Sequence, residues 1–115
     1  MAGKGDADGA ITSHKEAIKH DPNYAFAHFN LGEIYRQQER YAEAIACARD
    51  AIKADPIFSN AQAMLGLALR DSGDIPGARV ALTEAARLDP KRWAASLANL
   101  PPATPVAPAP REVNR

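Results

Sequence analysis

The sequence predicts an all-α protein, an α-solenoid in which helix-turn-helix hairpins stack on one another. The pairs Asp21-Pro22, Asp55-Pro56 and Asp89-Pro90 recur at a constant spacing, and a period of about 34 residues is typical of helical repeat proteins. The similarity continues inside the units, because Leu31-Gly32 falls on Leu65-Gly66. Apolar residues recur three or four positions apart, which indicates helices.

The composition favours a single domain with no electrostatic partner. The chain has 115 residues, of which 46% are apolar. Its 14 basic residues balance 14 acidic ones, so no net field attracts nucleic acid or an anionic membrane. No apolar run approaches the roughly 20 residues that span a bilayer, and the first ten residues lack the apolar run of a secretory signal. Because the lone Cys47 cannot form an internal disulfide, we expect a reducing, cytoplasmic location.

Residues 1–24 are interpreted as half a unit that contains only its second helix, near residues 8 to 20. Gly5-Asp6 is expected to form the turn before this helix. Because the first helix of the unit is missing, one apolar face has no helix to cover it, and it consists of Ala10, Ile11, Ala17 and Ile18. Two explanations compete. The chain is a piece of a longer array, or the face is buried by a partner or by another copy, in a homodimer through the half repeat.

Two full units follow, at residues 25–58 and 59–92. Each is expected to contain two antiparallel helices, and the four helices lie near residues 25 to 38, 41 to 54, 59 to 72 and 75 to 88. A glycine inside a helix costs roughly 1 kcal/mol against alanine. Gly32 and Gly66 therefore indicate that two helices approach closely at these positions.

The turns inside the two units are expected to differ. Gly73-Asp74 supplies a flexible turn residue and a carboxylate that can accept the first amide hydrogens of the next helix. Pro76 then sits in the first helical turn, where it loses no hydrogen bond. In the other unit Glu39-Arg40 stand at these positions and supply neither feature. We therefore expect the Glu39-Arg40 turn to be the least favourable.

The chain ends in a predicted cap and a proline-rich tail. Trp93, Leu97 and Leu100 share one face of a short helix at residues 93–100, which can close the second full unit. Residues 101–115 are rich in proline and alanine, so we expect a disordered, extended tail or linker. The stretch Pro102-Ala103-Thr104-Pro105 also fits the spacing of a polyproline ligand for aromatic grooves, a pattern that is common by chance.

The pattern Leu31-Gly32, Tyr35, Tyr41, Ala44, Ala51 and Pro56, together with its constant period, resembles the tetratricopeptide repeat. The resemblance covers about two and a half repeats and implies a right-handed superhelix. It also implies a protein-protein interaction module that binds a peptide or protein segment in a concave groove lined by the first helix of each unit. The matching positions are Phe26, Phe29, Glu33, Arg36, Gln37, Asn60, Ala63, Leu67, Arg70 and Asp71.

Two features of this groove indicate the chemistry of a ligand. Phe26 and Phe29 are adjacent on one helix, where they either anchor an apolar side chain or pack against a neighbouring helix. Arg36 and Arg70 occupy equivalent places, where they either form a ladder that grips carboxylates or remain solvated. The expected ligand is an apolar residue flanked by acids.

The sequence predicts no cofactor, no metal site and no catalytic site. The glycine-rich residues 3–9 match neither a phosphate loop nor a calcium loop. His14, His20 and His28 lack metal-type spacing, and no histidine partner is recognisable for Cys47. We expect a free-standing scaffold or adaptor that is not an enzyme. The alternative is the repeat segment of a larger enzyme whose catalytic domain is absent from this chain, as in the bacterial sulfotransferases and glycosyltransferases that resemble this arrangement.

Overall fold

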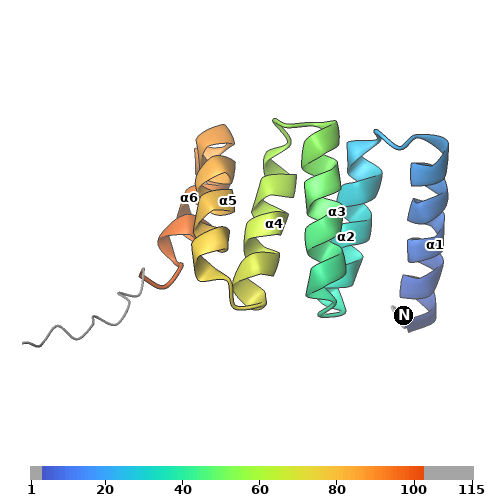
Figure 1. Cartoon of the computed structure of the whole chain (residues 1–115), viewed down its shortest axis with the longest axis horizontal. Coiled ribbons are helices and arrows are strands. Elements are labelled where there is room, and N and C mark those ends of the chain that lie inside the picture. Colours follow the sequence, from blue (N-terminus) through green and yellow to red (C-terminus); the bar gives the residue numbers. More distant parts are fainter. Residues whose placement is uncertain (1–3, 103–115) are drawn as a thin grey trace, which may run out of the picture.

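The computed structural model describes residues 4–102 and arranges them as a row of α-helices (Figure 1). Successive helices run in opposite directions, so the connections between them alternate between the upper and lower edges of the row in this view. Residues 4–102 contain no strand, and the predicted helical solenoid with a closing helix is confirmed. The helices are α1 (Lys4–His20), α2 (Ala25–Gln37), α3 (Tyr41–Ala54), α4 (Ser59–Asp71), α5 (Ile75–Leu88) and α6 (Pro90–Ala98).

The buried core runs through the row as two clusters of side chains. Each helix contacts the next one in the chain, and α2 also contacts α4. The larger cluster is centred on α4 and α5, where Met64 and Leu82 are the largest fully buried side chains. The smaller cluster contains Leu31, Tyr35 and Cys47 from α2 and α3. Between the helices lie alanines whose small side chains allow the backbones to approach.

Gly32 and Gly66 lie where neighbouring helices approach closely. A Cβ atom on Gly32 would lie 2.5 Å from Cε of Met64 and 3.0 Å from Cβ of Cys47. A Cβ atom on Gly66 would lie 2.6 Å from Cγ of Leu82. These distances are far below the usual separation of carbon atoms in contact. The close approach that the glycines predicted is therefore confirmed.

The two turns inside the full units differ as predicted. Gly73 has φ +101°, and the carboxylate of Asp74 accepts a hydrogen bond of 2.9 Å from the first turn of α5. At the equivalent position Glu39 has φ 61°, a left-handed backbone conformation that is unfavourable for L-residues because the Cβ atom is crowded. Arg40 makes no side-chain cap on α3. The Glu39-Arg40 turn thus carries backbone strain that the Gly73-Asp74 turn avoids.

The start of α1 differs from the prediction. The helix begins at Lys4, so Gly5 and Asp6 lie inside it and the turn predicted there is wrong. The two real turns are closed by backbone bonds to the preceding helix, as when the N–H of Asp74 donates to the carbonyl oxygen of Leu69 at 2.8 Å. Within the described residues no helix precedes α1. Nothing there closes a turn, and the α-helix extends back through Asp6 and Gly5 to Lys4.

The closing helix α6 begins at Pro90, earlier than the predicted residue 93. Proline is favourable in a first helical turn, and the carboxylate of Asp89 accepts a hydrogen bond of 3.3 Å from the N–H of Arg92. Asp89 therefore ends α5 and begins α6 without an intervening loop.

The predicted closing face is present, although it extends beyond the helix. Trp93 and Leu97 pack against the larger core cluster, and Leu100, which follows α6, is buried. The carbonyl oxygen of Pro101 accepts a hydrogen bond from Arg79 of α5. This bond holds the chain against α5 at the point where it leaves the cap. The predicted tail at residues 103–115 lies outside the described residues.

Candidate functional site

The residues predicted to line a groove lie on α2 and α4, which run in the same direction and contact each other. At about 100° per residue, the five positions on α2 fall on one face of that helix, and so do the five on α4. The two helices are linked twice across this face. Aromatic rings link their N-terminal ends, and charged groups link their C-terminal ends.

Four aromatic side chains form a chain of contacts at the N-terminal ends of α2 and α4. We call them the ring row, and in order of contact they are Tyr24, Phe26, Phe58 and Phe29. Neighbouring ring centroids are 6.5, 5.2 and 5.1 Å apart, and the ring planes are tilted by 59°, 58° and 51°. Tilted rings at these distances attract one another. Tyr24 is 49% exposed and Phe26 is 54% exposed, whereas Phe29 also packs against the larger core cluster.

Tyr24 and Phe58 were missing from the residues predicted from the sequence. They occupy the same position in successive repeats, each three positions after the aspartate of a repeated Asp-Pro pair. In both turns that aspartate's side chain accepts an N–H two residues on, at 3.2 Å for Asp21 and 3.3 Å for Asp55. Its carbonyl oxygen accepts the N–H of Tyr24 at 3.0 Å or Phe58 at 3.1 Å. The aspartates thereby place both rings directly before a helix, so the repeat itself carried the signal.

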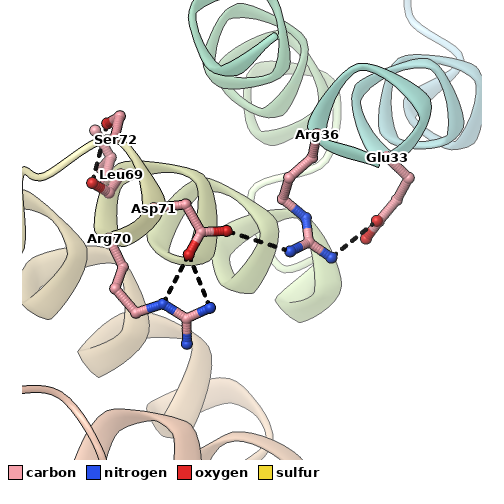
Figure 2. A network of polar contacts seen from close by, with 6 residues as sticks. All are labelled: Glu33, Arg36, Leu69, Arg70, Asp71 and Ser72. Carbon is pink, nitrogen blue, oxygen red and sulfur yellow. Dashed lines mark hydrogen bonds and ion pairs between the residues drawn. The ribbon is translucent and has the colours of Figure 1, made fainter. Parts of the chain in front are cut away.

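Charged side chains link the C-terminal ends of the same helices (Figure 2). Arg36 donates to Oε1 of Glu33 at 3.2 Å, and its second terminal nitrogen lies 3.7 Å from Oδ2 of Asp71. Arg70 holds the other oxygen of Asp71, with Nη2 at 2.9 Å and Nε at 3.0 Å. Two arginines and two carboxylates balance in charge. Arg36 and Arg70 are thus engaged within the chain and do not form the free cationic ladder that was one of the two alternatives left open by the sequence.

Two of the predicted groove residues offer little or no surface. Ala63 is fully buried in the larger core cluster, so its assignment to the groove lining is wrong. It stands at the position equivalent to Phe29, but its methyl group is too short to emerge between its neighbours. Leu67 is half-buried against the same cluster. Asn60 is partly exposed and Gln37 is exposed.

The exposed apolar face predicted on α1 is not formed as expected. Ile11 is buried in the smaller core cluster, and Ile18 packs against that cluster. The assignment of Ile11 to an exposed face is wrong because α2 covers it, whereas Ile18 is only partly buried. Ala10 and Ala17 are partly exposed, whereas the equivalent alanines of α3 are fully buried. The partly exposed strip of α1 therefore consists of Ala10, Ala17 and Ile18, without Ile11.

A pocket that the sequence did not predict opens on the opposite face of α4. It has a volume of about 1080 Å³ and lies between α3, α4 and α5. Leu65 and Leu69 line it from α4, Arg49 from α3, and Val80, which is 74% exposed, from α5. At about 100° per residue Leu65 and Leu69 point nearly opposite to Leu67. This pocket and the ring row therefore belong to different surfaces.

The remaining candidate groups have structural surroundings. Burial raises the pKa of the Cys47 thiol to about 11, so the thiol stays protonated near neutral pH. His28 is buried, and its Nε2 lies 2.8 Å from the carbonyl oxygen of Pro22. Within residues 4–102 no three His, Cys, Asp or Glu side chains gather to hold a metal ion. None of the described helices is long and apolar enough to cross a membrane.

Known families match the chain along the whole row of helices. Two family models described as tetratricopeptide repeat match residues 25–58 and 63–98, and one described as TPR repeat matches residues 3–38. No curated protein gave a significant match. Repeats of this kind generally mediate protein-protein interactions and are typically non-catalytic modules. With this period, these paired helices and these matches, the chain belongs to the tetratricopeptide repeat family.

Proposed function

We propose that the protein binds a peptide or protein segment across α2 and α4, with the ring row as the apolar anchor. One observation carries the proposal: four aromatic rings from two successive repeats contact one another at the surface, with Tyr24 and Phe26 about half exposed. Large, rigid aromatic side chains are the residues that most often dominate binding energy at interfaces. Phe29 and Phe58, which are partly buried, would hold Phe26 in place for a ligand.

The charges at the C-terminal ends of α2 and α4 modify the ligand expected from the sequence. Because Glu33 and Asp71 already neutralise Arg36 and Arg70, an acidic ligand would have to compete with ion pairs that exist in the free protein. Exchanging one such pair for another near the surface yields little free energy. We therefore propose a ligand whose apolar groups supply most of the affinity. Its binding should depend only weakly on salt concentration.

A selection from a displayed library of random peptides tests this function. Peptides enriched on the full chain should bind Phe26→Ala about tenfold or more weakly, because truncation removes an anchor from the middle of the contact. Val80→Ala is the matched control. It removes an even more exposed apolar side chain, but from the pocket on the other face of α4.

The control also defines the outcomes that oppose the proposal. Peptides that tolerate Phe26→Ala but lose affinity for Val80→Ala would move the binding site to the pocket between α3 and α5. An affinity that falls steeply with added salt would show that the charged groups, and not the rings, dominate recognition. Calorimetric titration of the enriched peptides at two salt concentrations separates these cases.

A further inference from the structure

The ring row has a shape that suits one class of ligand. Consecutive ring planes are tilted by 51° to 59°, so the rings do not stack flat on one another. Tyr24 and Phe26, which contact each other, are both about half exposed. Flat, apolar proline rings fit between aromatic side chains, and extended proline-rich segments bind aromatic-lined grooves in this way.

The surroundings of the ring row also favour an uncharged ligand with a stiff backbone. The arginines at the C-terminal ends of α2 and α4 are already paired with carboxylates of this chain. A polyproline II segment needs no charged partner, and little conformational freedom is lost when it binds. Its backbone carbonyl groups point outwards and have no internal partners. The half-exposed Tyr24 hydroxyl can donate a hydrogen bond to one of them.

The sequence of this chain contains such a segment directly after the cap. Pro102, Pro105 and Pro108 occur at every third position. A polyproline II helix has three residues per turn and rises about 3.1 Å per residue. In that conformation the three prolines share one edge of the segment, about 9 Å apart from one to the next. We call them the proline edge.

A chain cannot lay its own proline edge along its own ring row. Tyr24 and Phe58 lie in the connections at one end of the helices, whereas the chain leaves α6 at the other end (Figure 1). The bond from Arg79 to the carbonyl oxygen of Pro101 holds this exit against α5. The length of a 13-residue helix, about 20 Å, and the width of at least one further helix separate the two. In a polyproline II conformation a segment from Pro102 to Pro108 would span only about 19 Å.

We propose that the ring row of one copy binds the proline edge of a second copy of this chain. The inference rests on the proposed function, because it assigns a ligand to the same face of α2 and α4. The two contacting surfaces are different parts of the chain. Such a head-to-tail contact leaves one ring row and one proline edge free, so the assembly can grow beyond a dimer.

The first test measures the contact with a defined peptide. The probe is a labelled peptide of residues 100–111 with blocked ends, and its binding partner is the full chain carrying Pro105→Ala and Pro108→Ala, whose own tail does not compete. Fluorescence anisotropy should show saturable binding that weakens about tenfold when Phe26→Ala is added to this partner. Adding Ile57→Ala instead is the matched control, because Ile57 is 74% exposed beside Phe58 but lies outside the ring row. The same peptide carrying Pro105→Ala and Pro108→Ala should bind about tenfold more weakly.

The second test uses complementation between two defective chains. Analytical ultracentrifugation of the native chain should show an average mass that rises with concentration. Phe26→Ala, which retains only the proline edge, and the Pro105→Ala, Pro108→Ala chain, which retains only the ring row, should each remain monomeric. Mixed together, they should form a complex of one copy of each. Circular dichroism of both variants checks that the helices are intact.

Several outcomes would overturn the inference. It fails if the peptide shows no saturable binding up to roughly 1 mM, if the native chain is monomeric throughout, or if the two variants do not combine. It also fails if self-association survives in the Phe26→Ala chain, since the copies would then meet through another surface. If library peptides bind through Phe26 while the tail peptide does not, the proposed function stands and only the assignment of the second copy as ligand is lost.

Discussion

Glu39 shows how one residue can carry strain that the rest of a repeat avoids. Its φ of 61° lies in the left-handed region, at the position where the next unit has Gly73. The left-handed conformation costs an L-residue about 1 to 2 kcal/mol. Glycine avoids this cost but loses more conformational entropy on folding. We therefore predict that Glu39→Gly stabilises the protein by about 0.5 to 1 kcal/mol, seen as a rise of a few degrees in the thermal midpoint.

The neighbouring residue provides the control for this prediction. Gln38 has φ −87°, a conformation that any L-residue adopts. Gln38→Gly gains nothing from relief of strain and should lower the thermal midpoint. If both substitutions destabilise the chain by similar amounts, the strain assigned to Glu39 is not real.

At the scale of the element, α1 depends on one face that contacts α2. Ile11 lies in the smaller core cluster with Leu31 and Tyr35, so a charge placed there would be buried without a partner. We predict that Ile11→Glu destabilises the protein by about 2 kcal/mol or more and releases α1 from α2. Limited proteolysis should then cut within α1 at concentrations of protease that leave the native chain whole.

Ala17 on the same helix gives the matched variant. It is partly exposed on the strip of Ala10, Ala17 and Ile18. Ala17→Glu should therefore leave both the thermal midpoint and the proteolytic pattern close to those of the native chain. A large loss of stability from Ala17→Glu, equal to that from Ile11→Glu, would mean that the strip is covered in solution.

At the scale of the whole molecule, Cys47 reports on opening of the stack, because it lies between helices in the smaller core cluster. Burial raises the pKa of its thiol from 9.0 to about 11. Between these values the unfolded chain releases the proton while the folded chain retains it, so the free energy of unfolding should fall as pH rises from 9 to 11. The native thiol should also react with Ellman's reagent at least about 100-fold more slowly than the unfolded chain.

Two comparisons isolate the contribution of Cys47 to the loss of stability at alkaline pH. Tyrosines and lysines titrate in the same alkaline range, so the native chain must be compared with Cys47→Ala in denaturant unfolding at each pH. The native chain should lose more stability than the variant between pH 9 and 11. Rapid labelling of the native thiol without denaturant would show that this part of the row opens locally.

Features that depend on period or on backbone chemistry were predictable from the sequence alone. The constant spacing of the Asp-Pro pairs located the paired helices, Gly32 and Gly66 marked the close contacts, and Glu39 marked the strained turn. Each of these follows from residues near one another in the chain or from their repetition. The start of α1 was predicted wrongly because it depends on contacts outside the local sequence. A turn at Gly5 requires a preceding helix to close it.

Only part of the surface proposed to bind a partner could be predicted from the sequence. The repeat pattern itself determined which helices stack and which faces of α2 and α4 look toward each other. Only the tertiary structure decided that Phe58 joins Phe26 and Phe29 into one row, that Asp71 neutralises Arg36, and that α2 covers Ile11. Helical periodicity determines the direction in which a side chain points from the axis of its own helix. Which groups meet also depends on the separation and offset of two helices, and these are set by all the side chains packed between them.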